Sequence, residues 1–378
     1  MSKSIDLISE IEDKINTVRT RSLDLSFNEL LDMYKDGELI IDPEYQRLFR
    51  WSEVQQSRFI ESLLLEMPIP PIFVIEQEEG KYELIDGLQR VSSYIHFRGE
   101  HPDYQEEEED SEKPRFLKLD GCDICESLNG LIYKTLPTTL QIRLKRNFIR
   151  VEVLRKESDP RLRYHMFKRL NTGGSKLSDQ EVRNCTIRLL SPKFNDFLIE
   201  CSKFPQFENC ISSLNDDKRE QKYDQELVLR FFALKNMREQ YVHDVGSYLT
   251  ECMEYFSISP DNFNYEKEKN IFETTFDILN KTLGKKSFSP ATATKKNLSS
   301  RFAIYHYEAI TLCIALNLDG LNKLTETNIS NLKAILTDIK KDQGFIDITT
   351  GGGKNYASPL KKRVEFAEER IREFCNGL

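Results

Sequence analysis

The chain has 378 residues and a net charge of −8, with 39% hydrophobic and 31% charged residues. These values exclude global disorder, and the length predicts two domains. Residues 1–20 lack the pattern of a secretory signal and no apolar run is long enough to span a bilayer, so we expect a cytoplasmic protein with no membrane contact. Eight cysteines are too few for a disulfide scaffold, which predicts reduced thiols.

Residues 1–85 predict helices that alternate with extended segments. A serine followed three residues later by Glu or Gln forms a capping-box pattern at Ser26 and at Ser52, and each pattern predicts the start of a helix. Apolar runs on both sides of a polar turn with Gly80 predict a β-hairpin. The expected ranges are a helix over 1–20, extended backbone around 42–47, and hairpin strands over 71–75 and 82–85.

The hairpin ends in Asp86-Gly87-Leu88-Gln89-Arg90, which we interpret as the main candidate site. The apolar period changes here from that of a strand to that of a helix, which is expected to end at Gly99. Gly87 allows a ligand to approach the backbone, the N–H groups of the new helix favour an anion, and Arg90 adds a charged fork suited to phosphate. Asp86 could cap the helix or hold a metal ion or water. The alternative is a capped turn whose arginine pairs with a surface carboxylate.

The sequence after Gly99 continues the mixed pattern before it becomes helical. Residues 103–112 are strongly acidic and contain no aliphatic side chain, which predicts a solvated loop. Strands are expected over 116–119 and 148–154, with a helix over 138–146 between them. From Asp159 onward the apolar period is that of helices.

The C-terminal half contains no pattern for a second sheet and no repeat of fixed period. Its helices are expected at about 193–203, 222–240, 244–256, 266–283, 300–316, 327–341 and 360–375. The predicted fold class is therefore α+β, with a mixed α/β domain over residues 1–165 followed by an all-α domain over residues 166–378.

Two further polar clusters coincide with breaks in the predicted secondary structure. Tyr45-Gln46-Arg47 with Arg50 lies in the extended segment, and the glycine loop from Asn171 to Lys176 precedes a third capping box at Ser178. Each cluster places an arginine, a lysine or an amide where loop backbone is free to contact a ligand. Together with Asp86 to Arg90 they predict a phosphate-handling site, and unrelated turns are the alternative.

Positive charge is concentrated in one segment of this acidic chain. Residues 141–188 contain 13 Lys or Arg and 5 Asp or Glu. This segment is the best candidate to face a polyanion, either a nucleotide or a DNA duplex.

Several other patterns are interpreted as non-functional. Cys122 and Cys125 form a lone C-x-x-C without the partners of a zinc site, and we favour unpaired thiols. Residues 349–355 resemble a P-loop only superficially, because no strand is expected ahead of them. The histidines are scattered, and neither an H-E-x-x-H pair, a G-x-S-x-G elbow nor an HNH pattern occurs.

The order of several motifs, rather than any one of them, resembles a known family. The motifs are Pro43-Glu44-Tyr45-Gln46-Arg47, Trp51, Ile60-Glu61-Ser62-Leu63, residues 67–73, Asp86 to Arg90, residues 167–174 and residues 177–184. In this order they resemble the N-terminal domain of GmrSD-type, modification-dependent restriction proteins, strongly over about residues 25–185 and more weakly through Asp224 to Arg230. The resemblance implies a ParB/sulfiredoxin-like fold for the N-terminal domain.

In that family an Asp-Gly-Gln-Gln-Arg motif is associated with binding and hydrolysis of nucleoside triphosphates, which couples recognition of modified phage DNA to cleavage. The resemblance implies catalytic roles for Asp86, Gln89 and Arg90, with Asp86 also holding Mg²⁺. The implied nucleotide-binding residues are Tyr45, Gln46, Arg47, Gly87 and Asn171. Leu88 replaces the usual first glutamine of the motif, and the nuclease domain that many relatives carry is not expected here.

Three functions follow as hypotheses. The leading one is a nucleotide-binding, NTP-hydrolysing regulatory component of a prokaryotic restriction or antiphage system that acts with a separate nuclease or defence partner. The second is a non-enzymatic module that binds DNA or a partner through segment 141–188. The third is a metal-dependent DNA nickase that depends on Asp86.

Overall fold

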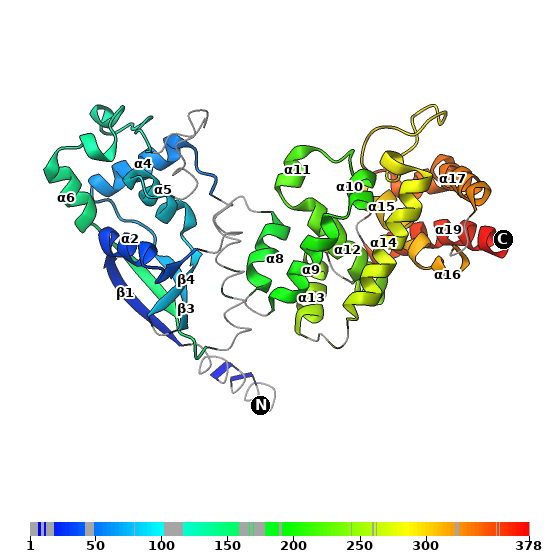
Figure 1. Ribbon diagram of the computed structural model, residues 1–378, viewed down its shortest axis with the longest axis horizontal. Coiled ribbons are helices and arrows are strands. Elements are labelled where there is room, and N and C mark those ends of the chain that lie inside the picture. The colour runs from blue at the N-terminus through cyan, green and yellow to red at the C-terminus, as the bar shows by residue number, and fades with distance from the viewer. Residues whose placement is uncertain are drawn as a thin grey trace. The chain divides into compact units, whose positions relative to one another are not determined.

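The computed structural model divides the chain into two compact units, residues 1–175 and 176–378 (Figure 1). The structure describes residues 7–8, 11–12, 19–41, 49–78, 80–101, 116–158, 166, 169, 178–188, 191–242, 244–258, 261, 263–321, 325–352, 354 and 356–377. The described part of the first unit mixes strands and helices, and that of the second is helical apart from one isolated bridge. The predicted α+β class is therefore confirmed, with the division between units later in the chain than the predicted boundary at residue 165.

A mixed five-stranded sheet forms the centre of the first unit. Its strand order is β1-β5-β3-β4-β2. Strand β5 pairs antiparallel with β1 and parallel with β3, whereas β4 pairs antiparallel with β3 and parallel with β2. The strands are β1 (Thr20–Ser26), β2 (Leu39–Ile40), β3 (Ile72–Glu78), β4 (Lys81–Asp86) and β5 (Phe148–Leu154). The β3–β4 pair confirms the predicted hairpin.

Four α-helices accompany the sheet in the described part of this unit, and their ends follow the capping signals in the sequence. They are α2 (Phe27–Lys35), α4 (Glu53–Leu64), α5 (Leu88–Arg98) and α6 (Thr138–Arg146). Ser26 Oγ accepts from the Glu29 N–H at the start of α2, and Ser52 forms a complete capping box with Gln55 at the start of α4. Helix α5 ends at Gly99, which adopts φ 75° as predicted.

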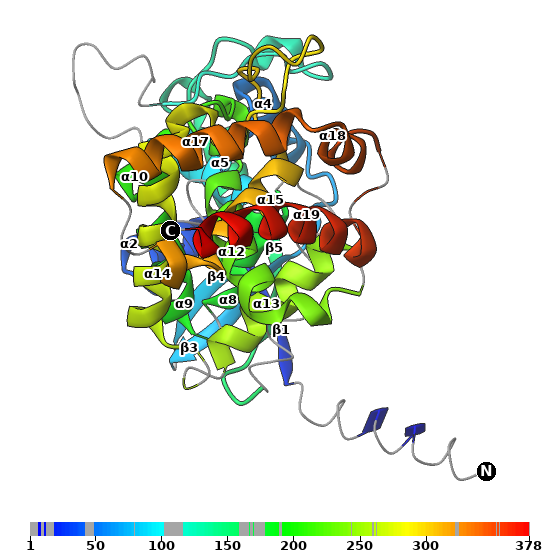
Figure 2. The ribbon, with the colours of Figure 1, turned by 90° about the vertical axis from the view of Figure 1, so that its right-hand side faces the viewer.

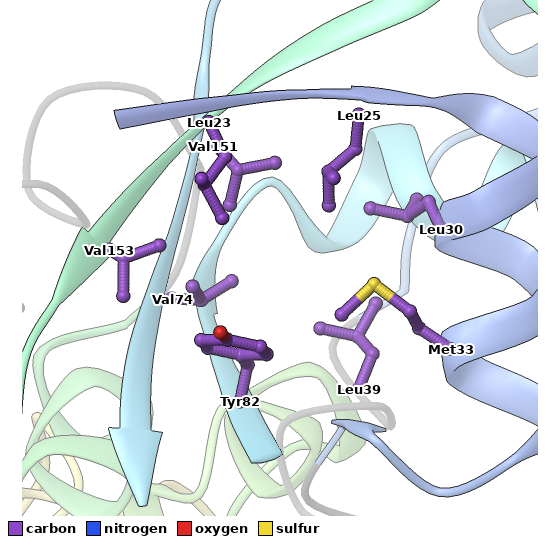
Figure 3. A pocket seen from close by; sticks show the side chains of 9 residues that line it. All are labelled: Leu23, Leu25, Leu30, Met33, Leu39, Val74, Tyr82, Val151 and Val153. Atoms are coloured by element: carbon purple, nitrogen blue, oxygen red, sulfur yellow. The ribbon is translucent and has the colours of Figure 1, made fainter. Parts of the chain in front are cut away.

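The apolar side chains of α2 and the sheet close the core on one face. A cavity of about 10 Å³ remains between them, with Leu30 and Met33 of α2 opposite Val74 of β3 and Val151 of β5 (Figure 3). A space of this size holds a single water at most, so the core is well packed and offers no room for a ligand.

The structure corrects three sequence-based assignments in this unit. Strand β1 was not predicted, although Leu23 and Leu25 alternate with polar residues as a half-buried strand requires. The two-residue strand β2 was also missed. The predicted strand at 116–119 is wrong: Leu119 donates to Leu131 O and accepts from Gly130 N–H, so its backbone is satisfied by a local turn rather than by the sheet.

The second unit packs its helices around two that are buried on almost all sides. These central helices are α12 (Tyr223–Met237) and α15 (Ile304–Ala315), whose side chains are mostly buried. Helix α19 (Ala357–Asn376) packs across α15 (Figure 2). The other α-helices described here are α8 (Asp179–Ile187), α9 (Pro192–Ser202), α10 (Pro205–Cys210), α11 (Asp216–Glu220), α13 (Val245–Ile258), α14 (Tyr265–Thr282), α16 (Leu318–Leu321), α17 (Glu326–Lys341) and α18 (Gln343–Thr349).

All seven helices predicted for this half are present, with ends shifted by a few residues. The sequence analysis missed the short helices α10, α11, α16 and α18. Within the described residues, no helix combines the length and the apolar character that a membrane span requires.

A chain of buried ion pairs joins four helices of the second unit. Arg183 of α8 bonds Glu226 of α12 at 2.6 Å, and Arg230 of α12 bonds the same carboxylate at 3.1 Å. Arg230 also bonds Glu308 of α15 at 2.6 Å, and Arg363 of α19 bonds the other oxygen of Glu308. The Glu308 side chain is only 4% exposed, so these charges are stabilised by one another rather than by water.

We expect Glu308→Ala to destabilise the helical unit strongly. The substitution leaves the guanidinium groups of Arg230 and Arg363 buried without a shared carboxylate, and breaking such a pair costs about 3–5 kcal/mol. Urea unfolding followed by far-UV circular dichroism measures the loss. Glu365→Ala is the matched control, because Glu365 pairs with Lys361 on the exposed side of α19 and its loss should cost about 0–1 kcal/mol. Equal effects of both substitutions would contradict a stabilising role of the buried chain.

Acid should destabilise the helical unit through His306. This side chain is buried against Phe345, and burial, together with the positive charge of Lys340, lowers the pKa of His306 to about 3. In the unfolded chain His306 therefore takes up a proton near pH 6.5, whereas in the folded chain it stays neutral. Below that pH the free energy of unfolding falls by about 1.4 kcal/mol per pH unit. We expect His306→Leu to reduce the slope of unfolding free energy against pH between 6 and 4. An unchanged slope would show that other groups control the acid response.

Candidate functional site

The predicted change from strand to helix lies at Gly87. Strand β4 ends at Asp86, Gly87 adopts φ 104°, and α5 begins at Leu88. A Cβ atom on Gly87 would lie 2.3 Å from Cγ2 of Ile72, so only glycine fits between the turn and the start of β3. No side chain caps the first turn of α5. Asp86 therefore does not act as the helix cap, which was one of its expected roles.

Arg90 connects this turn to the backbone directly before β3. Its Nη2 atom donates to Asp86 Oδ2 at 2.9 Å and to the carbonyl oxygen of Pro71 at 3.1 Å. The Arg90 side chain is 17% exposed and that of Asp86 is 31% exposed, so the ion pair lies at the edge of solvent. Arg90 Nε is buried and makes no hydrogen bond to a described residue. The arginine thus pairs with the carboxylate of its own motif.

Gln89 connects the same turn to the segment before α4. Its Oε1 atom accepts from the backbone N–H groups of Arg50 and Trp51, each at 3.0 Å. Gln56 of α4 in turn donates to the carbonyl oxygen of Trp51 at 2.8 Å. The structure therefore brings Arg50, from the second predicted cluster, next to the Asp86–Arg90 turn. It gives Gln89 a positioning contact that the sequence analysis did not foresee, and the catalytic role of Gln89 stays a prediction.

Leu88 occupies the position of the usual first glutamine of the motif and is buried, with 3% of its surface exposed. An apolar residue suits this place, because a buried amide would need hydrogen-bond partners. The remaining predicted residues, Tyr45, Gln46, Arg47 and Asn171, lie outside the described residues.

The described part of the site offers one carboxylate to a metal ion. Asp86 Oδ2 is bonded to Arg90, and Oδ1 makes no hydrogen bond to another described residue. No group of three His, Cys, Asp or Glu residues able to hold a metal occurs in the described chain. A Mg²⁺ ion commonly takes only one or two protein carboxylates and completes its shell with phosphate oxygens and water. Asp86 therefore fits an ion that arrives with a nucleotide rather than a pre-formed metal centre.

Cys122 and Cys125, the C-x-x-C pair, belong to a loop that is held by α4. Cys122 is buried, and burial raises the pKa of its thiol to about 11. The buried carboxylate of Glu61 accepts from the N–H groups of Ile124 and Cys125 at 3.1 and 2.6 Å. Glu61 of α4 therefore anchors this loop, which was not predicted.

The P-loop-like glycines follow helix α18 rather than a strand. Because a P-loop connects a strand to a helix, the helix ahead of these glycines does not fit a P-loop.

The basic segment 141–188 contributes residues to both units. It crosses the division between the two units at residue 175. Several of its arginines are engaged: Arg150 pairs with Asp24 at 3.1 Å, and Arg183 is buried against Glu226. Lys145 and Arg146 at the end of α6 form no ion pair with a described carboxylate, and Phe148 beside them is 65% exposed.

The first unit is thus an α+β domain whose polar motif lies at a strand-to-helix turn, with an arginine and a carboxylate at the edge of solvent. Residues 27–188 match the family model of the GmrSD restriction endonuclease, N-terminal domain, and this part of the chain belongs to that family. No curated protein and no solved structure matches the chain. The matched region ends at residue 188, directly after α8, so it extends past the first unit into the helical one.

We expect Gly87→Ala to destabilise the first unit by about 2–4 kcal/mol, from backbone strain at positive φ and from the clash with Ile72. Gly80→Ala is the matched control, because Gly80 has φ 81° but no atom within 4 Å of an added Cβ, and only the strain of about 1 kcal/mol applies. Urea unfolding followed by the fluorescence of Trp51, the only tryptophan, reports on this unit. Equal losses for the two variants would show that the packing of Gly87 against Ile72 contributes nothing.

Proposed function

We propose that this protein is a nucleotide-binding, NTP-hydrolysing regulatory component of a restriction or antiphage system and acts with a separate nuclease or defence partner. The family match of residues 27–188 supports a role in restriction. The observation that supports nucleotide binding is the start of α5, which no side chain caps and beside which Asp86 and Arg90 form an ion pair.

The phosphates of the nucleotide would lie at the start of α5, where the positive end of the helix dipole and the N–H groups of the first turn favour an anion. Arg90 already has two of its donors on Asp86 and Pro71. A phosphate would compete with Asp86 for the guanidinium, and Arg47 from the neighbouring cluster would add a second positive charge. This exchange would release the Asp86 carboxylate toward a metal ion.

Asp86 would then hold Mg²⁺ together with phosphate oxygens, and the ion would supply charge neutralisation on the phosphates. Gln89 would act indirectly, because its side-chain oxygen holds the backbone of residues 50 and 51. By this contact Gln89 would keep the backbone of Arg50 and Trp51 next to the phosphate site. Tyr45, Gln46 and Asn171 are proposed to line the rest of the nucleotide.

We expect nucleotides with Mg²⁺ to raise the thermal stability of the full chain, since a ligand at 100 times its Kd stabilises the folded state by about 2.7 kcal/mol. The experiment is a thermal-shift panel of the four NTPs with and without Mg²⁺, followed by turnover measurements. Asp86→Ala and Arg90→Ala should abolish the shift and the turnover. Arg58→Ala is the control, because Arg58 forms an exposed pair with Asp123 in the same unit.

If folded Asp86→Ala and Arg90→Ala retained full nucleotide binding and turnover, the proposal would fail. The second candidate is a module that binds DNA. Lys145 and Arg146, which pair with no described carboxylate, and the exposed Phe148 beside them favour it. DNA binding with steep salt dependence and no nucleotide turnover would select it.

A further inference from the structure

A polar hollow of about 490 Å³ lies at the other end of β4 from Asp86. Tyr82, near the start of β4, forms one wall, and Figure 3 shows its ring closing the apolar cavity under α2. The parallel strands β3 and β5 both end at this hollow. Ligands of open α/β sheets commonly bind outside the carboxyl ends of parallel strands. The full lining is Arg21, Glu76, Gly80, Tyr82, Arg155, Lys156 and Glu157.

Glu76 gives the hollow an unsatisfied acceptor. Its side chain is 8% exposed, and its Oε2 atom is buried and accepts no hydrogen bond from a described residue. The nearest cation is Arg155, whose Nε lies 3.6 Å from Oε2, beyond hydrogen-bond distance. A buried carboxylate oxygen without a donor is costly. A ligand hydroxyl or amine in the hollow would satisfy it.

Two cations on the rim of the hollow lack a carboxylate partner. Arg21 donates to the hydroxyl of Tyr82 at 2.7 Å and forms no ion pair with a described residue. Lys156 likewise forms no ion pair within the described part of the chain. Arg155 is shared between Glu76 and Glu157. The lining therefore has three cations against two carboxylates, and its unmatched charge is positive.

We propose that this hollow is a second ligand site that binds a small phosphorylated sugar. The phosphate lies between Arg21 and Lys156, and a sugar hydroxyl donates to Glu76. The volume falls within the range of small-molecule sites. The site shares no residue with the turn at Asp86 to Arg90, so it does not depend on the nucleotide function proposed above.

Isothermal titration of the full chain with ribose 5-phosphate and with inorganic phosphate tests the site. We expect ribose 5-phosphate to bind about tenfold more tightly than phosphate, because only the sugar reaches Glu76. Glu76→Gln should remove most of this preference. Arg21→Ala and Lys156→Ala should weaken both ligands by about five- to tenfold. Lys118→Ala is the control, because Lys118 is exposed elsewhere in the same unit.

Each outcome decides the proposal. Equal binding of the two ligands, or no binding of either, overturns it. Should Glu76→Gln fail to fold, the exposed Arg21 and Lys156 variants still decide, and unchanged affinity in both overturns the site. Loss of ribose 5-phosphate binding in Asp86→Ala, with Arg21→Ala unaffected, would assign the ligand to the other end of β4 and also overturn it.

Discussion

The close approach of the Gly87 backbone to Ile72 is the constraint on which the candidate site depends. Because no Cβ atom fits between them, the chain can leave β4, turn at positive φ and enter α5 within one residue. Arg90 then reaches back over the turn to Asp86 and to the backbone before β3. Gln89, which precedes Arg90 in α5, fixes the backbone of residues 50 and 51. One tight turn therefore brings together segments that are distant in the sequence.

The helical unit depends on a different constraint, which is the mutual neutralisation of buried arginines and glutamates. Arg183 lies in the region that matches the family model, whereas Glu226 and Arg230 lie beyond it. Their contacts in this structure are with one another and with α15 and α19. These residues therefore stabilise the helical unit. The matched region ends directly after α8, and the polar partner of Arg183 in that helix belongs to α12. A fragment cut at residue 188 would leave the buried face of α8 without this partner.

The first unit carries polar features at both ends of β4 and a closed apolar core between them. At one end Asp86 and Arg90 neutralise each other beside the start of a helix that no side chain caps. An anionic ligand there must displace Asp86 from Arg90. At the other end, among the described residues, Glu76 Oε2 has no hydrogen-bond donor and Arg21 and Lys156 have no carboxylate partner, so a ligand there would supply these partners. The core cannot take a ligand, because the space left between α2 and the sheet is about 10 Å³.

The sequence by itself determined the α+β class, the β3–β4 hairpin, the switch to helix at Gly87 and the major helices, because apolar period, glycine and capping serines act over a few residues. It did not determine β1 or the path of 116–119, since strand pairing depends on partners far along the chain. For the same reason, only the tertiary structure showed that Arg90 also donates to the carbonyl oxygen of Pro71. It alone also showed that Gln89 holds Trp51 and that the buried Glu76 lines one hollow with Arg21, Arg155 and Lys156, because such arrangements form only after distant segments have packed.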